Sequence, residues 1–281
     1  MLRALAIYIS GKSARAVRGA TIGLCTLAMA AAPNPAHAQD MLQYLDLEST
    51  EFTTAETTRE AIAALIAGRK PGTTIDLSAK RLNKLDLSSL DLSGFNLQSA
   101  RINGTSFKGA NLDKAVLDQA WALDADFTGA SLKGASLFST QFMGATMDSA
   151  DFTGARVAGD FSRASLKGAR FDRADLSADM RNQSMGLMRG VFRSSNLEGA
   201  SFRDANLARV VLEYSNLRSA DMSGANLSGS EMGGADLTGA SVAGANFNAA
   251  DVNSAKLLEM RGKNDARDLD KTVNLDRAFR D

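Results

Sequence analysis

The sequence predicts an all-β solenoid, and three regularities lead to that fold class. An apolar residue recurs at every fifth position from Leu77 onward, first as Leu82, Leu87 and Leu92. A small residue, usually alanine, stands two positions before most of these apolar residues, and glycine often stands two positions after. A helix repeats at 3.6 residues and a strand at 2, so neither gives a period of five. A coil whose corners recur every five residues does, with the apolar and the small residue pointing inward.

The inward alanines and the glycines each have a steric reason. The two inward positions share a narrow core, which favours alanine at the second of them. A four-residue turn must join successive faces of the coil, and the third residue of a type II turn needs a positive φ. Glycine adopts that conformation without steric cost, which accounts for Gly104, Gly109 and Gly129.

The repeating phrases resemble those of a known family. Ala225 to Gly229 read ANLSG and Ala235 to Gly239 read ADLTG, which is the A-(D/N)-L-x-x pattern of pentapeptide-repeat proteins. The resemblance covers roughly two-thirds of the chain. It implies a right-handed quadrilateral β-helix with four pentapeptides per coil. Residues twenty positions apart should then stack, so we expect Asn206, Asn226 and Asn246 to form a ladder of surface amides.

Residues 1–38 are interpreted as a secretory signal peptide. Basic residues from Arg3 to Arg18 precede an apolar run over residues 20–32, and Ala36-His37-Ala38 supplies the small residues of a cleavage site. We therefore expect an exported protein, periplasmic or secreted, with no stable membrane span after cleavage. The chain's one cysteine, Cys25, and its one histidine, His37, both lie in this segment. The mature chain then lacks disulfides, thiolate or imidazole catalysis and ordinary zinc sites, and no cofactor or metal is expected.

The segment 39–74 is expected to contain a short capping helix. Thr57 and Glu60 have the spacing of a capping box, and Ile62, Leu65 and Ile66 follow on one helical face. Gly68 should end the helix, with Pro71 beyond it. Such a helix would cover the exposed core of the first coil.

Two β-helical segments, 75–176 and 191–258, are expected on either side of a methionine-rich loop or kink at 177–190. A one-residue deletion already shortens the spacing between Val157 and Phe161. The loop carries Met180, Met185 and Met188; packing against the coil is the favoured interpretation, and copper(I) binding is the alternative. Residues 259–281 lose the five-residue period, with Leu269, Val273, Leu275 and Phe279 spaced irregularly. They are expected to form a C-terminal cap, and a homodimer contact there is the alternative.

The charge pattern disfavours two functional classes. The repeat places its aspartates at outward positions, where solubility and backbone hydrogen bonding explain them without a catalytic pair. An enzyme is therefore not expected, although a β-helical polysaccharide hydrolase or lyase remains the alternative. Some relatives implied by the resemblance mimic DNA and modulate topoisomerases, which needs a strongly acidic rod. The mature chain has a net charge of only about −4, so neither that role nor a nucleic-acid partner is expected.

Two surfaces are candidates for binding a protein or an anionic envelope component. The first surrounds the chain's only tryptophan, at a coil where Ala122 replaces the usual large inward residue. Either the coil bulges and the indole fills the space, or an exposed apolar patch forms from Val116, Trp121, Leu123, Phe138 and Met143. The second is a basic surface made of Arg163, Arg170, Arg173, Arg189, Arg193, Arg203 and Arg209. The function expected from the sequence is a non-catalytic, exported scaffold.

Overall fold

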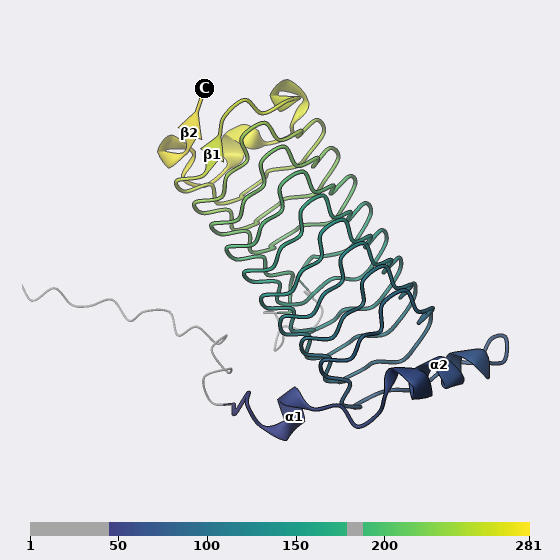
Figure 1. Cartoon of the computed structure of the whole chain (residues 1–281). Helices are drawn as coiled ribbons and strands as arrows, with labels where there is room; N and C mark the ends of the chain where they lie inside the picture. The colour runs from purple at the N-terminus through teal and green to yellow at the C-terminus, as the bar shows by residue number, and fades with distance from the viewer. Residues whose placement is uncertain (1–44, 179–187) are drawn as a thin grey trace, which may run out of the picture. The chain divides into compact units, whose positions relative to one another are not determined.

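The chain winds into a coil (Figure 1), in which residues twenty positions apart form parallel bridges along most of its length. This computed structural model describes residues 45–178 and 188–281. Asp76 pairs with Asn96, and Arg81 pairs with Arg101, each in parallel register. Each coil therefore contains four pentapeptides, and the predicted β-solenoid is confirmed.

The paired residues form four columns along the solenoid, here named A to D. Column A contains Asp76, Asn96, Val116, Ser136, Arg156, Asp175, Asn206, Asn226, Asn246 and Arg267. Column B contains Arg81, Arg101, Trp121, Gln141, Asp160, Val191, Val211, Glu231, Asp251 and Val273. Column C contains Asp86, Ser106, Asp126, Thr146, Ser165, Asn196, Asn216, Asp236, Lys256 and Phe279, and column D contains Asp91, Asn111, Ser131, Asp151, Arg170, Ser201, Asp221, Ser241 and Arg261.

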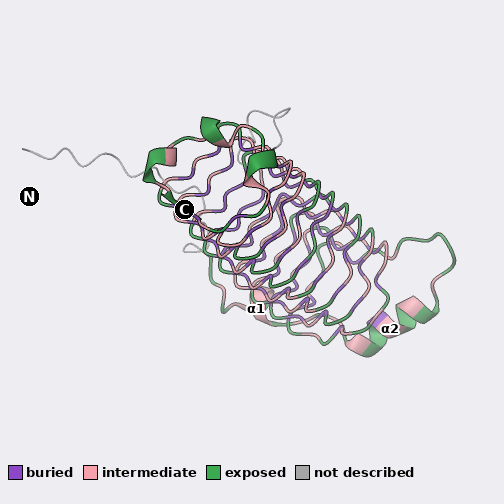
Figure 2. Ribbon diagram, turned by 90° about the horizontal axis from the view of Figure 1, so that it is seen from above, coloured by how far each residue is buried: buried purple, intermediate pink, exposed green. Residues whose placement is uncertain are grey.

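Up to Leu257, the residue after each column position points into the coil and forms the core, which Figure 2 shows as a buried interior. Phenylalanines from successive coils stack face to face: the ring centroids of Phe107 and Phe127 are 4.7 Å apart, and those of Phe152 and Phe171 also 4.7 Å. Burying one such side chain stabilises the fold by about 2 kcal/mol. Stability therefore accumulates coil by coil, as in other repeat proteins.

Outside the core, the expected amide ladder is present in column A. The Asn226 side-chain amide donates to Oδ1 of Asn206 at 3.2 Å, and that of Asn246 donates to Oδ1 of Asn226 at 3.3 Å. Asn206 extends the ladder to Oδ1 of Asp175 at 3.1 Å. The ladder satisfies side-chain donors that would otherwise depend on water.

Both irregularities of the repeat lie at the corner between columns A and B, in consecutive coils. Gln141 pairs with Asp160, nineteen residues on, and Asp160 pairs with Val191, thirty-one residues on. The ladder continues across both changes, so the two predicted β-helical segments share one register. A side chain on Gly159 would meet the Thr140 carbonyl oxygen at 2.6 Å, which explains the glycine at this shortened corner. Met180 and Met185 lie outside the described residues.

Two helices precede the coil: α1 (Thr50–Thr53) and α2 (Arg59–Ala67). The N-cap of α2 is Thr58, whose hydroxyl accepts from the Ala61 N–H at 3.3 Å, so the prediction of a capping box from Thr57 was one residue early. Ile62 is fully buried in the core and Ile66 packs against it, whereas Leu65 is exposed. The apolar face of α2 is therefore narrower than predicted.

The C-terminal residues follow a six-residue period instead of the irregular spacing expected. Arg261, Arg267, Val273 and Phe279 continue the four columns at intervals of six. Between them lie three 3₁₀ helices, η3 (Lys263–Asp265), η4 (Leu269–Lys271) and η5 (Leu275–Arg277). Strand β2 (Phe279–Arg280) pairs in parallel with β1 (Lys256–Leu257) and closes this final turn, here named the cap coil (residues 261–281).

Candidate interaction surface

The N-terminal segment lies across the first coils at column B. Ala55 forms an antiparallel bridge with Leu82, and the Glu56 N–H donates to the Arg81 carbonyl oxygen at 2.9 Å. The Asn83 side-chain amide donates to the carbonyl oxygens of Glu51 at 3.1 Å and Thr54 at 3.0 Å. Residues 50–56, here named the strap, are thus attached to the coil by backbone and side-chain hydrogen bonds.

Ion pairs add to the attachment of the strap. Glu51 lies 3.3 Å from the Arg81 guanidinium and 3.0 Å from that of Arg101, and Glu56 lies 2.9 Å from the Lys80 ammonium. The hydrogen bond from Lys80, together with the positive charge of Arg81, holds the pKa of the Glu56 carboxyl below its usual value. Because these groups are partly exposed, solvent screens the attraction and each pair adds little to stability.

Trp121 contacts the strap and does not enter the core. Its ring meets the ring of Phe52 edge to face, with centroids 5.4 Å apart, and the Arg101 guanidinium lies 5.4 Å from the Phe52 centroid. The coil keeps its register here, since Trp121 pairs with both Arg101 and Gln141. The predicted bulge is therefore absent.

Ala122 keeps its inward position in the coil. It is fully buried, and Phe127, at the adjacent inward position of the same coil, meets Phe142 edge to face with centroids 5.5 Å apart. Sequence periodicity did not reveal Phe52 as the neighbour of Trp121, because Phe52 lies outside the repeat.

The remaining residues of the predicted patch lie on two adjacent coils around column B. Leu123 and Met143 stack at the corner between columns B and C, where the Asp124 N–H donates to the Met143 carbonyl oxygen at 3.1 Å. Phe138 lies at the corner between columns A and B, with the Arg156 guanidinium 5.1 Å from its ring centroid. Val116 is on the adjoining column A. All five side chains, Trp121 included, are half-buried.

The seven arginines of the predicted basic surface are distributed over several corners. Arg163 and Arg193 lie between columns B and C, Arg189 and Arg209 between A and B, and Arg170, Arg173 and Arg203 in or next to column D. Four of them are ion-paired, as Arg170–Asp172, Arg189–Glu231, Arg193–Glu213 and Arg203–Asp221. The structure therefore does not bring the seven together on one face.

Two kinds of feature are absent from the described ranges, 45–178 and 188–281. No group of three or more His, Cys, Asp or Glu side chains is arranged to hold a metal ion there. No helix in these ranges has the length and apolar content needed to cross a bilayer.

Several solved structures are similar to this chain, and pentapeptide repeat proteins are among them. HetL, from the cyanobacterium Nostoc sp. strain PCC 7120, is involved in heterocyst differentiation regulation; it is 26% identical, with a TM-score of 0.42 over 79% of this chain and 99% of its own. QnrB1, a plasmid-mediated fluoroquinolone resistance protein, is 19% identical, with a TM-score of 0.34 over 74% of this chain and 93% of its own. A protein from the thylakoid lumen of Arabidopsis thaliana is 25% identical, with a TM-score of 0.19 over 40% of this chain and 65% of its own.

A comparison with curated proteins found no match. The family profile for pentapeptide repeats matches the sequence in eight copies, over residues 81–120, 124–157, 191–229 and 220–257. These ranges span half of the chain and coincide with the four-column coil. The chain therefore belongs to the pentapeptide repeat family.

Proposed function

We propose that this protein is a non-catalytic, exported scaffold, a right-handed β-helix that binds a protein partner through column B. The observation that carries the proposal is the patch of Trp121, Leu123, Phe138 and Met143, whose half-buried apolar side chains gather on two adjacent coils. Contiguous apolar surface usually marks a contact site, and tryptophan is enriched among the residues that dominate binding energy.

The backbone beneath the patch is suited to binding without rearrangement. Coil-to-coil hydrogen bonds hold it on both sides: the Ala122 N–H donates to the Gln141 carbonyl oxygen at 2.8 Å, and the Leu123 N–H donates to Oδ1 of Asn103 at 2.9 Å. A surface that is ordered before association loses less conformational entropy when it binds. The patch also adjoins the strap, so a partner could contact Phe52 and Trp121 together.

The binding proposal is tested with a photo-crosslinking amino acid in place of Leu123. The matched control carries the same group in place of Lys133, which has the equivalent corner position in the same coil, after column D. We expect a specific adduct from position 123, none from position 133, and loss of the adduct on Met143→Asp. Equal capture at both positions, or capture that survives Met143→Asp, would show that the patch is not the binding site.

Export is supported by the basic, apolar and small-residue pattern of residues 1–38. It is tested separately, by mass spectrometry of the protein from cell fractions of a Gram-negative host. We expect a mature chain that begins at Gln39 in the exported fraction. An uncleaved chain confined to the cytosol would refute export without bearing on the patch.

A further inference from the structure

The cap coil has four equivalent positions, each two residues after a column residue. These positions hold Lys263, Leu269, Leu275 and Asp281, which follow Arg261, Arg267, Val273 and Phe279. Two adjacent sides of the cap coil therefore carry leucine at this position, and the other two sides carry lysine and aspartate. The Lys263 ammonium lies 2.7 Å from Oδ1 of Asp281, so an ion pair connects the first and the last side of the cap coil.

In the cap coil, the residues that follow the column positions no longer carry large apolar side chains. Gly262, Asp268 and Asn274 follow Arg261, Arg267 and Val273, whereas Val242, Phe247 and Val252 follow the same columns one coil earlier. All three have a positive φ, of 73°, 56° and 60°. The chain turns sharply there, and Leu269 and Leu275, which follow Asp268 and Asn274, are only partly buried against the core.

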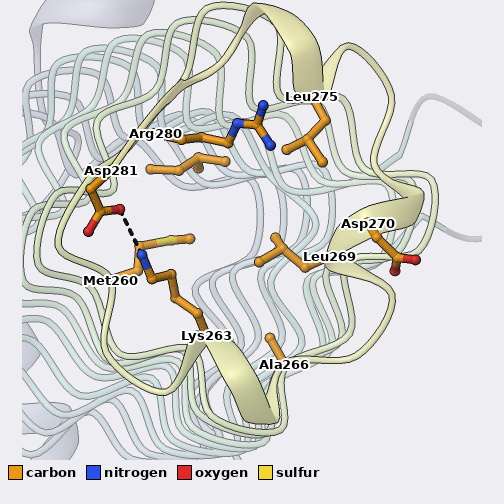
Figure 3. Close-up of a pocket in the computed structure, with 9 residues that line it drawn as sticks. Met260, Lys263, Ala266, Leu269, Asp270, Leu275, Arg280 and Asp281 are labelled. Atoms are coloured by element: carbon orange, nitrogen blue, oxygen red, sulfur yellow. Dashed lines mark hydrogen bonds and ion pairs between the residues drawn. The ribbon is translucent and has the colours of Figure 1, made fainter.

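The resulting apolar cavity has a volume of about 350 Å³. Figure 3 shows the side chains that line it. Leu257 and Met260 lie beneath it and are almost completely buried, while Ala266, Leu269 and Leu275 line its sides. The volume falls within the range of small-molecule sites in proteins, at its lower end. The cavity can therefore admit an alkyl chain but not a folded domain.

Charged side chains of both signs lie at the mouth of the cavity. Lys263 and Arg280 lie at the rim, with Asp281 between them, while the Asp270 carboxylate points away from the cavity (Figure 3). Within the described residues, the Arg280 guanidinium has no ion-pair partner, and Lys263 has only Asp281. An anionic group at the rim could accept hydrogen bonds from both cations.

We propose that this cavity is a binding site for a single-chain amphiphile with a carboxylate head, of the fatty-acid class. The alkyl chain lies among Leu257, Met260, Leu269 and Leu275, and each methylene buried there contributes to affinity through the hydrophobic effect. The carboxylate lies at the rim beside Arg280 and Lys263. This site is separate from the patch around Trp121, and it depends neither on export nor on a protein partner.

The proposal is tested by isothermal titration calorimetry with decanoate and with decanol as probes, on the full chain and three variants. Arg280→Glu should weaken decanoate binding at least tenfold and leave decanol binding unchanged, because only the acid needs the cation. The control Arg277→Glu makes the same charge change on η5 outside the cavity lining and should alter neither ligand. Ala266→Trp should abolish the binding of both by filling the cavity.

A spectroscopic measurement on the unaltered protein guards against variants that misfold. With ¹³C-methyl-labelled methionine, decanoate should move the resonance of Met260, assigned by Met260→Leu, and leave that of Met143 in place. Equal shifts at both methionines, or affinity unchanged by Ala266→Trp, would overturn the proposal. A dimer in light scattering that Ala266→Trp dissociates and decanoate does not would identify a second copy as the occupant instead.

Discussion

Removing the Phe52 ring should loosen the strap and expose Trp121 without unfolding the solenoid. Phe52→Ala deletes the edge-to-face contact with Trp121, at 5.4 Å, and the cation–π contact with Arg101, also at 5.4 Å. An aromatic pair of this kind contributes about 0.5–1.5 kcal/mol and a cation–π contact about 0.5–1 kcal/mol. Together they amount to about 2 kcal/mol, or about thirty-fold in the equilibrium between docked and undocked strap.

The rest of the attachment should survive this substitution. The hydrogen bonds from Asn83 to the strap and the bridge between Ala55 and Leu82 do not involve the ring. The loss is therefore confined to a local opening free energy, while the coils beneath keep their core contacts. Local and global opening are separable in this way when different contacts control them.

Two measurements report on local opening of the strap around Trp121. Trp121 is the only tryptophan in the chain, so acrylamide quenching of its fluorescence reports on this contact alone, and quenching should increase in the variant. Hydrogen exchange at the Glu56 amide, which donates to Arg81, should accelerate about thirty-fold. The control Phe279→Ala, at an exposed ring of the cap coil, should change neither reading. Unchanged quenching with unchanged exchange would refute the assignment of Phe52 as the partner of Trp121.

Three further predictions concern the ladder, the cap coil and the outward carboxylates. Asn226→Ala removes two bonds of the amide ladder, those with Asn206 and Asn246, and should lower the free energy of urea unfolding by about 1–2 kcal/mol; no change in that free energy would contradict a stabilising role for the ladder. Gly262→Ala should destabilise the cap coil more than Gly72→Ala destabilises the segment around residue 72, as measured by hydrogen exchange of the local amides. Both glycines have a positive φ, but only at position 262 does the added methyl group meet another residue, Ala243, at 2.7 Å. The pKa of Asp76 is lowered chiefly by a hydrogen bond from a backbone N–H two residues on, so its contribution to stability is present above the unfolded-state pKa and is lost as pH falls through the folded-state pKa. Asp76→Asn should therefore reduce the loss of stability in urea titrations below about pH 4, and an equal loss in both proteins would contradict this cause.

The repeating part of the fold was predictable because the same five-residue pattern recurs along most of the chain. The five-residue period determines which side chains point inward, and the four pentapeptides per coil implied by the family resemblance place Asn226 between Asn206 and Asn246. Each repeat contacts only its neighbours, so a local pattern is sufficient to describe long stretches.

The parts outside the repeat were predicted less well, for two physical reasons. The contact between Phe52 and Trp121 joins residues far apart in the chain, and no periodicity relates them. The cap coil does have a rhythm, but its six-residue phrases place Asp268 and Asn274 where the preceding coils have apolar residues. Continued five-residue apolar spacing therefore does not predict the six-residue phrases of the cap coil, although Leu269 and Leu275 are six residues apart.

The corner between columns A and B has a practical consequence for engineering. Bridged residues are regularly twenty positions apart. At this corner one coil has one residue fewer, between Gln141 and Asp160, and the next coil has eleven more, between Asp160 and Val191, yet both bridges form. Gly159 and Gly190 occupy the same position on either side of this change, where neighbouring carbonyl oxygens leave little room for a side chain. A foreign peptide inserted at this corner, with the following glycine retained, should be displayed from the side of an otherwise unaltered solenoid. The same corner in other coils would let several such peptides be presented at spacings set by the coil itself.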